Sequence, residues 1–382
     1  MCIHSPWFTL PPSPAADGAI PLMPASRKED PFSPHDDDTE QYTDIGTALS
    51  LCDGDNAIHH LASLRYFGVS ATPLTSEGLK KLLGRLQSLR HLAIYLNYAK
   101  EFRTIGCLGE LKHLARVTVH TCPSITSLHG IECSTSLTEI NLTSCINLSS
   151  ITSLVTLPTL RSLRINGCAA VAPSPFMEAI LYSPPASSSS DEGETNRRAL
   201  QRLSYLQLSE LDNNCDNLSA LRFLPLLTAL DLHLTATDNN AVVVIAKNCV
   251  HLQALSLAEC FVISEIEPLA ALPYLSHLLL RNTTISDASL RRFCEGVPPS
   301  LRVLDISECD DITDCCCVTS IETLTRINAQ GTRVTAESVY ELVKDTVTMD
   351  NTPRTMGVSL ETVDLRGCTQ LKNISSLFAG RR

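Results

Sequence analysis

The chain has 382 residues, of which 44% are hydrophobic and 5% aromatic, and its formal net charge at pH 7 is -11. This acidic balance argues against a surface that binds nucleic acid or an anionic membrane. No apolar run approaches the ~20 residues that a membrane span needs, and the N-terminal sequence lacks the basic and apolar regions of a secretory signal. We therefore expect a soluble, cytoplasmic protein that binds neither nucleic acid nor membrane.

The first 55 residues differ in composition from the rest of the chain. Eight prolines fall within the first 40 positions, and three acids follow at residues 36–38. Such a segment buries too little apolar surface to offset the entropy lost on ordering. We predict a disordered tail over residues 1–55, followed by a single repeat array over residues 56–382.

From residue 61 onward, the phrase Leu-x-x-Leu-x-Leu-x-x-Cys returns about every 23 to 26 residues. The clearest copies start at Leu137, Leu160, Leu252, Leu301 and Leu360. Looser copies start at Leu61, Leu89, Leu114, Leu203, Leu227, Leu275 and Leu324. About twelve copies at this period are typical of a leucine-rich repeat array. The predicted fold is an α/β solenoid, with a curved parallel sheet on the concave face and mixed helices and irregular turns on the convex face.

The phrase has a physical basis. With its first leucine as position 1, positions 1, 4 and 6 point into the solenoid, and positions 3, 5 and 7 point outward on the concave face. One repeat cannot bury its leucines alone, so neighbouring repeats must stack into a continuous core. Position 9 turns the chain away from the strand and leaves backbone groups that need a partner.

Position 9 is a cysteine in six repeats, namely Cys122, Cys145, Cys168, Cys260, Cys309 and Cys368. Four other repeats have a polar residue there: Asn97, Thr235, Thr283 and Thr332. Val69 and Leu211 occupy it in the remaining two. Buried thiols act as small hydrophobes with a weak donor, so we interpret the six cysteines as a structural ladder. Unpaired thiols also favour a reducing compartment.

The segments that return along the convex face are of two kinds. Four have the apolar spacing of an amphipathic helix and cover residues 76–86, 240–249, 286–296 and 336–345. Others are shorter and have room only for irregular or 3₁₀ turns. Two departures from the repeat spacing predict inserted loops at about residues 172–199 and 346–358.

The first of these loops contains the run SPPASSSSDEGET, a low-complexity segment of serine, proline and acids. Ser188 and Ser189 each have an acid three residues later, which is the pattern that acidophilic kinases favour. Phosphorylation would add about -1.5 to -2 charge at each site. The loop is therefore a candidate regulatory site, and a passive spacer is the alternative.

Catalytic motifs are not found. The chain has no glycine-rich phosphate loop, no G-x-S-x-G elbow and no H-E-x-x-H pair. The run Cys315-Cys316-Cys317 follows several aspartates, but three consecutive residues cannot easily converge on one ion. We expect no enzymatic activity, no cofactor and no metal site.

Two phrases carry a family resemblance. The phrase NAVVVIAKNCVHLQALSLAECFVIS resembles the cysteine-containing repeats of F-box leucine-rich-repeat proteins, the substrate adaptors of ubiquitin ligases. ISEIEPLAALPYLSHLLLRNTTIS resembles the 22-residue repeats of a protein-phosphatase-1 regulatory subunit and of internalins. An array that mixes both types is similar to leucine-rich-repeat proteins of kinetoplastid parasites. No F-box-like helical segment precedes the first repeat and no RING-type cluster is present.

The concave face of the N-terminal half is the candidate binding surface. Its register predicts outward side chains that are basic or aromatic: Arg65, Phe67, His91, Tyr95, Arg116 and His120. Arginine and aromatic residues are common anchors of protein interfaces, although a solvated strand face also carries polar residues. We predict a monomeric, non-catalytic scaffold that binds a partner protein here. The alternative is a substrate adaptor of a ubiquitin ligase or a regulatory subunit of a protein phosphatase.

Overall fold

The structure, a computed structural model, describes residues 63–71, 74–182, 200–211, 218–296, 300–344 and 360–371, all within the unit His60–Arg382. The predicted tail over residues 1–55, the predicted loop at residues 346–358, and both Ser188 and Ser189 lie outside the described residues.

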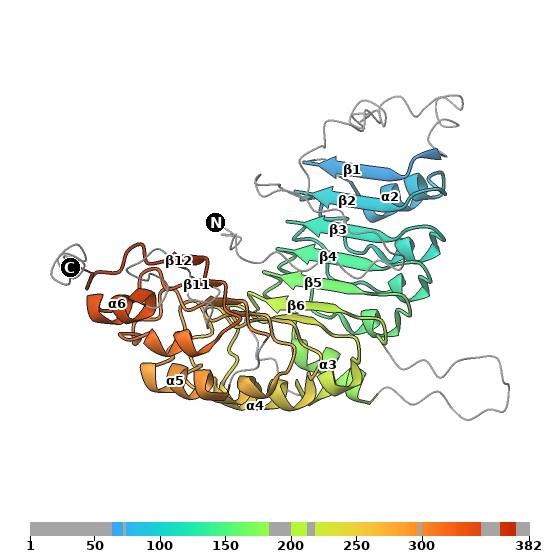
Figure 1. Cartoon of the computed structure of the whole chain (residues 1–382). Coiled ribbons are helices and arrows are strands. Elements are labelled where there is room, and N and C mark those ends of the chain that lie inside the picture. The colour runs from blue at the N-terminus through green and yellow to red at the C-terminus, as the bar shows by residue number, and fades with distance from the viewer. Residues whose placement is uncertain are drawn as a thin grey trace, which may run out of the picture. The chain divides into compact units, whose positions relative to one another are not determined.

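Twelve strands form one parallel sheet in chain order, one strand for each repeat (Figure 1). The first six have five residues each: β1 Tyr66–Ser70, β2 His91–Tyr95, β3 Arg116–His120, β4 Glu139–Thr143, β5 Ser162–Asn166 and β6 Tyr205–Ser209. The last six have three each: β7 Ala229–Asp231, β8 Ala254–Ser256, β9 His277–Leu279, β10 Val303–Asp305, β11 Arg326–Asn328 and β12 Thr362–Asp364. This arrangement confirms the predicted leucine-rich repeat solenoid.

The return segments are α-helices and 3₁₀ turns that pack against one another along the convex face, with three successive 3₁₀ turns after the first helix and strict alternation from the third of these turns onward. The α-helices are α2 Ser76–Leu83, α3 Pro173–Leu181, α4 Asn239–Asn248, α5 Asp287–Gly296 and α6 Ala336–Lys344. The 3₁₀ turns are η2 Gly106–Glu110, η3 Ile131–Cys133, η4 Thr152–Thr156, η5 Leu218–Phe223, η6 Glu267–Ala271 and η7 Cys316–Ser320. All four predicted helices are present.

Helix α3 corrects the prediction of an inserted loop at residues 172–199. The helix begins with Pro173, whose fixed φ suits a first helical turn. It buries Phe176, Met177 and Ile180 against the core. The segment thus forms a convex helix like those of other repeats, and only residues 183–199 lie outside the described chain.

The core is the stack of leucine positions. In the fourth repeat, Leu137, Ile140 and Leu142 are each 0% exposed, while Glu139 and Thr143 alternate with them on the outer face. Burying one such side chain contributes about 1.5 to 3 kcal/mol. Because every repeat offers these positions to its neighbours, stability depends on contacts between repeats.

The register of the first repeat differs from the prediction. Tyr66 pairs with His91 and Phe67 with Leu92, so the first repeat begins at Leu64 and not at Leu61. Phe67 therefore occupies position 4 and is only 2% exposed, and Val69 occupies position 6. The predictions of Phe67 on the concave surface and of Val69 at position 9 were wrong. By this register, position 9 is Thr72, which lies outside the described residues.

Position 8 is left-handed in all twelve repeats, with φ between 49 and 75°. Only three of these residues are glycine, and the full set is Ala71, Leu96, Thr121, Ser144, Gly167, Glu210, Leu234, Glu259, Asn282, Glu308, Gly331 and Gly367. This conformation directs the N–H toward the next repeat. Ser144 N donates to Asn166 O at 2.9 Å, and the same bond recurs in all repeats from the first to the eleventh. The bond to the neighbour offsets the steric cost of positive φ.

The ladder cysteines follow the predicted arrangement. Five of them, Cys122, Cys145, Cys168, Cys260 and Cys309, are 0% exposed, and Cys368 in the last described repeat is half-buried. Each thiol faces the carbonyl oxygen of position 6 in the preceding repeat. The Sγ–O distance is 3.1 Å from Cys309 to Leu280 and 4.0 Å from Cys145 to Val119.

Candidate functional site

The outward side chains of the first three strands form two rows on the concave face. We call them the N-terminal concave patch, defined by Tyr66, His91, Tyr95, Arg116 and His120. The rows run across adjacent strands because Tyr66 pairs with His91 and Tyr95 with His120 in the register. The ring centroids are 6.4 Å apart in the first pair and 6.1 Å apart in the second. Each ring contact thus spans two repeats.

The patch is less basic than the sequence suggested. Burial, and then the charge of Arg116, lower the pKa of His91, so its imidazole is neutral at pH 7. Arg116 itself lies 3.3 Å from the Glu139 carboxylate on β4, although its side chain remains 58% exposed. The patch therefore offers aromatic faces and hydrogen-bonding nitrogens around one partly neutralised guanidinium.

The predicted site residues divide into three groups. His91, Tyr95, Arg116 and His120 lie on the concave face as expected. Arg65 is exposed, but it precedes β1 and does not belong to the strand. Tyr66 takes the outward place that had been given to Phe67, and sequence reasoning missed it. The signal for the correct register was the polar Thr72, which falls at position 9 when Leu64 is position 1.

A buried polar network lies farther along the concave face, where β6 meets β7. His233 Nδ1 lies 3.0 Å from Asp231 Oδ1, and its Nε2 lies 3.3 Å from Glu210 Oε1. Burial alone would lower the pKa of His233. Its hydrogen bonds to Asp231 and Glu210 and their negative charges outweigh burial and raise that pKa to about 9. His233 is therefore a cation held between two carboxylates, and this arrangement is structural.

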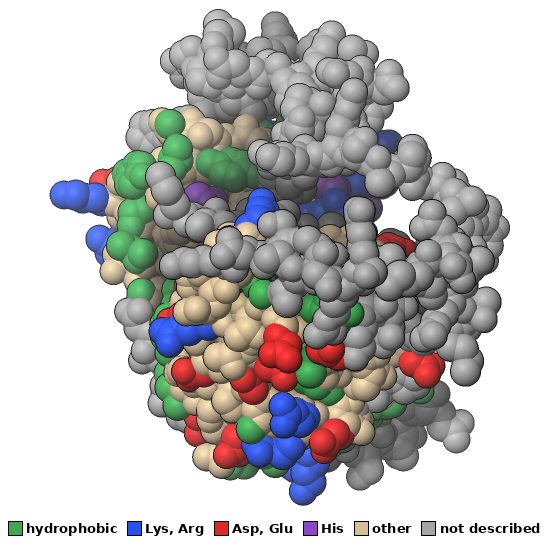
Figure 2. All heavy atoms as spheres, turned by 60° about the vertical axis from the view of Figure 1, so that its left-hand side comes forward, with side chains coloured by type: hydrophobic (Ala, Val, Ile, Leu, Met, Phe, Trp, Pro, Cys, Tyr) green, Lys and Arg blue, Asp and Glu red, His purple; other side chains and the backbone are tan. Residues whose placement is uncertain are grey.

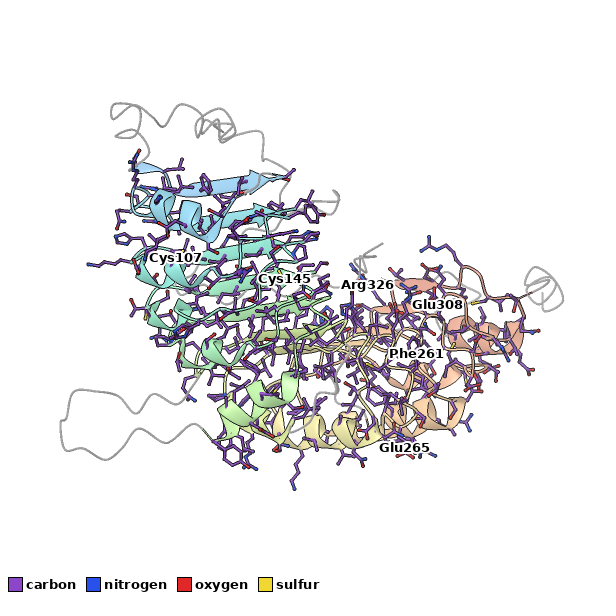
Figure 3. The ribbon with its side chains drawn as sticks, turned by 180° about the vertical axis from the view of Figure 1, so that it is seen from behind. Cys107, Cys145, Phe261, Glu265, Glu308 and Arg326 are labelled. Carbon is purple, nitrogen blue, oxygen red and sulfur yellow. The ribbon has the colours of Figure 1, made fainter. Side chains whose placement is uncertain are left out.

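The C-terminal half carries charged side chains on the same face. Arg281 donates two hydrogen bonds to the Glu308 carboxylate, with Nε–Oε2 at 3.1 Å and Nη2–Oε1 at 3.0 Å. Glu308 and Arg326 both lie in this half of the array (Figure 3). Acidic and basic side chains are interspersed on the face that Figure 2 shows.

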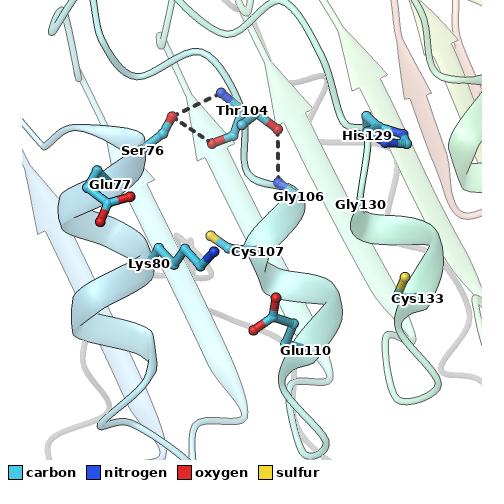
Figure 4. A pocket seen from close by; sticks show the side chains of 10 residues that line it. All are labelled: Ser76, Glu77, Lys80, Thr104, Gly106, Cys107, Glu110, His129, Gly130 and Cys133. Atoms are coloured by element: carbon cyan, nitrogen blue, oxygen red, sulfur yellow. Dashed lines mark hydrogen bonds between the residues drawn. The ribbon is translucent and has the colours of Figure 1, made fainter.

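A pocket of about 380 Å³ opens on the convex side between α2, η2 and η3 (Figure 4). Its lining is Ser76, Glu77, Lys80, Thr104, Gly106, Cys107, Glu110, His129, Gly130 and Cys133. The turns approach closely here, because a Cβ on Gly106 would lie 1.8 Å from the His129 carbonyl oxygen. Ser76 Oγ donates to Thr104 O at 3.0 Å and so joins the two repeats.

The pocket shows no activated nucleophile. Burial raises the pKa of the Cys107 thiol to about 11, which keeps it protonated at pH 7. Figure 3 shows this residue on the side of the convex turns. Within the ranges that the structure describes, no group of three or more His, Cys, Asp or Glu side chains could hold a metal ion. No helix of the described residues is long and apolar enough to cross a membrane.

These features define the chain as a leucine-rich repeat solenoid. No family model matches it. A curated protein named "Putative adenylate cyclase regulatory protein", from Trypanosoma equiperdum, is 28% identical over 177 residues, which are 46% of this chain and 25% of that protein. The chain therefore spans about a quarter of the length of this relative.

Solved structures were also compared with this chain. An internalin (inlF) from Listeria monocytogenes matches with a TM-score of 0.51 and 17% identity, over 82% of this chain and 87% of that one. TLR13 in the TLR13–ssRNA13 complex matches with a TM-score of 0.49 and 17% identity, over 82% and 47%. The internalin match agrees with the resemblance seen in the 22-residue repeats, and it shows the fold.

Proposed function

We propose that this protein is a non-catalytic interaction scaffold that binds a partner protein through the N-terminal concave patch. The observation that carries the proposal is the pair of ring contacts, Tyr66 with His91 and Tyr95 with His120, which align aromatic groups across three strands. Rigid aromatic side chains lose little entropy on binding and often anchor interfaces. Arg116 supplies a cation at the end of the row that begins with Tyr66 and His91, so an acidic, partly apolar partner surface is the best complement.

A more specific alternative is a role as the recognition subunit of an enzyme supplied in trans. A ubiquitin-ligase adaptor or a phosphatase regulatory subunit would use the same concave patch to select its client. The name of the curated relative, a regulatory protein, favours this kind of role, with binding in place of catalysis. Adenylate cyclase, which that name mentions, is a further enzyme that such a subunit could regulate.

The test is affinity capture of partners by the full chain, followed by binding measurements with two variants. Tyr95→Ala should weaken the captured complex by about 1 to 3 kcal/mol without changing the melting temperature. Thr143→Ala is the matched control, because Thr143 occupies the same position 7 one repeat beyond His120. Normal binding by Tyr95→Ala would refute the patch. Co-purified ligase, phosphatase or cyclase subunits would select among the alternatives.

We further propose that Ser188 and Ser189 are phosphorylated in the serine and acid-rich segment of residues 183–195. Each would add about -1.5 to -2 charge. Phosphopeptide mapping of protein isolated from cells should find both sites occupied, and replacement of both by alanine should change partner affinity. Unmodified peptides, or a variant that behaves as the wild type does, would reduce this segment to a spacer.

A further inference from the structure

One position just outside the repeated phrase has a structural role in several repeats. We call the residue before the first leucine position 0. Its hydroxyl donates to the carbonyl of the first leucine in the preceding repeat. These bonds join Ser136 to Leu114 at 2.8 Å, Thr159 to Leu137 at 2.7 Å, Ser300 to Leu275 at 2.9 Å and Thr323 to Leu301 at 2.8 Å. The fold therefore uses serine or threonine here as a tether between repeats.

Five repeats have no serine or threonine at position 0, because His113 and Arg202 occupy it in the repeats of β3 and β6 and three further residues occupy it in the repeats that follow β6. Position 0 is Leu226, His251 and Tyr274 in the repeats of β7, β8 and β9, and the register of these strands aligns the three residues side by side. Leu226 is 54% exposed and Tyr274 is 55% exposed. The rings of His251 and Tyr274 are stacked, with centroids 6.1 Å apart and an interplanar angle of 20°. We call this row the apolar ledge.

Two arginines lie in the next two repeats toward the C-terminus, two and three residues beyond position 0. The register pairs His277 with Val303 and Val303 with Arg326, and Arg302 directly precedes Val303. Burial, and then the charges of Arg302 and Arg326, lower the pKa of His277. Neither arginine forms an ion pair with a described carboxylate, unlike Arg281, which binds Glu308. We call Arg302 and Arg326 the arginine pair.

We propose that the apolar ledge and the arginine pair form a second docking surface, which binds an extended peptide segment of another protein that carries apolar residues next to acidic ones. This surface goes beyond the concave site proposed above. The apolar ledge stands where four other repeats carry a tethering hydroxyl, and its side chains are exposed, so burial in the core does not account for them. Two guanidiniums that form no ion pair within the described part of a chain of net charge -11 favour carboxylates as their complement.

The dimensions favour a peptide over a second copy of this chain. From the repeat of β7 to that of β11 there are four steps of about 4.8 Å, or roughly 19 Å, which about six extended residues span. A stable dimer needs roughly 800 Å² per partner, far more than three ledge side chains provide. Leu226 cannot stack on a base, whereas it can bury a side chain of a peptide, so the ledge fits protein better than single-stranded RNA.

The experiment selects from a seven-residue phage-displayed library on the immobilised full chain and then measures the affinity of one enriched peptide by fluorescence anisotropy. Enriched sequences should combine two or three apolar residues with adjacent acids. Tyr274→Thr and Arg326→Gln should each weaken binding at least tenfold. Tyr274→Thr installs the residue type that this position holds in other repeats, so it should preserve or raise stability.

Two controls separate this surface from other effects. His113→Thr changes an exposed position 0 residue in the repeat of β3, and it should leave peptide affinity unchanged. Tyr95→Ala should also leave it unchanged, so failure of the concave site would be seen independently. Enrichment without acids, no enrichment at all, or wild-type peptide affinity in both Tyr274→Thr and Arg326→Gln would overturn the proposal. Tighter binding of a single-stranded uridine oligonucleotide than of any peptide would overturn it as well.

Discussion

The two halves of the array end their strands differently. Strands β1 to β6 pair through position 7, whereas β7 to β12 stop at position 5. In four of the shorter strands, position 5 is an Asp or Asn whose side chain accepts the position 7 N–H of its own repeat: Asp231, Asp305, Asn328 and Asp364. Asn141 in β4 accepts the Thr143 hydroxyl instead, and its strand continues. In these repeats the side-chain hydrogen bond thus competes with the backbone hydrogen bonds between strands.

The early end of the strand changes what position 9 does. A position 6 carbonyl that no longer faces a paired strand needs another donor. In the C-terminal half it receives a threonine hydroxyl from its own repeat and a thiol from the next, as Leu280 O does from Thr283 at 2.8 Å and Cys309 at 3.1 Å. In the N-terminal half, where strand pairing continues to position 7, the thiols lie 3.6 to 4.0 Å from the position 6 carbonyl. The cysteine at position 9 thus donates a short hydrogen bond to the preceding repeat in the C-terminal half, whereas in the N-terminal half it makes longer contacts to that carbonyl and to the position 7 carbonyl of its own repeat.

The largest expected effect lies at the boundary between the halves, at His233. Its pKa in the folded protein, about 9, exceeds the ordinary 6.5. The stabilisation is therefore complete below pH 6.5 and is lost as pH rises through 9, and it amounts to something on the order of 3 kcal/mol. Urea unfolding should show the wild type losing its advantage over His233→Gln between pH 7 and 10. A constant difference over that range would mean that the cation contributes nothing.

The next effect concerns the buried carboxylate of Asp305, which is 2% exposed and accepts hydrogen bonds from the Ser307 N–H and hydroxyl. Asp305→Ala leaves these donors unsatisfied and should destabilise by about 2 kcal/mol. Asn141→Ala, at the same position in a strand that does not use the side chain in this way, should cost less than about 1 kcal/mol. Equal losses of unfolding free energy for Asp305→Ala and Asn141→Ala in urea titrations would show that position 5 plays the same role in both halves.

Thiol replacements test the same distinction through position 9. Cys309→Ala should cost about 2 to 3 kcal/mol, and Cys145→Ala about 1 to 2, because only the first also loses a short hydrogen bond. Serine should recover part of the loss at Cys309 and none at Cys145. Thermal and urea unfolding of the four variants, with partner binding unchanged, would confirm this order. A serine rescue at both sites would show that both thiols act as donors.

Position 8 should give the smallest effect, and a similar one in both halves. Ser144 at φ 53° carries a steric cost that glycine lacks. Ser144→Gly should stabilise by about 0.5 to 1 kcal/mol, after the larger entropy loss of glycine is subtracted. Gly331→Ala in the C-terminal half should destabilise by a similar amount, because its φ is 73°. Opposite signs for the two substitutions are the expected outcome, and a loss at Ser144→Gly would contradict it.

The repeated leucines predicted the sheet, its order and four convex helices, because one strand per repeat follows from burial alone. Two features of the fold were predicted wrongly, each for a local reason. The first repeat was misread because Leu61 and Leu64 both fit position 1, and only pairing with His91 distinguishes them. Helix α3 was assigned to a loop because the long spacing between Leu160 and Leu203 was read as one insertion, although part of that segment forms the convex helix of its own repeat. The His233 network could not be predicted, since its carboxylates come from different repeats.

The left-handed residue at position 8 gives the array a direction. A leucine, threonine or glutamate keeps this conformation while the following repeat supplies the carbonyl that its N–H meets, as Thr143 O does for Thr121 at 2.8 Å. Each repeat therefore acts as a template for the one before it. Nine of the first ten repeats have a non-glycine residue at position 8 and depend on this support, whereas Gly331 and Gly367 need it least and stand at the last two described repeats. Order should accordingly spread from the C-terminal repeats toward the N-terminus during folding, and a break in the array should loosen the repeat that precedes it.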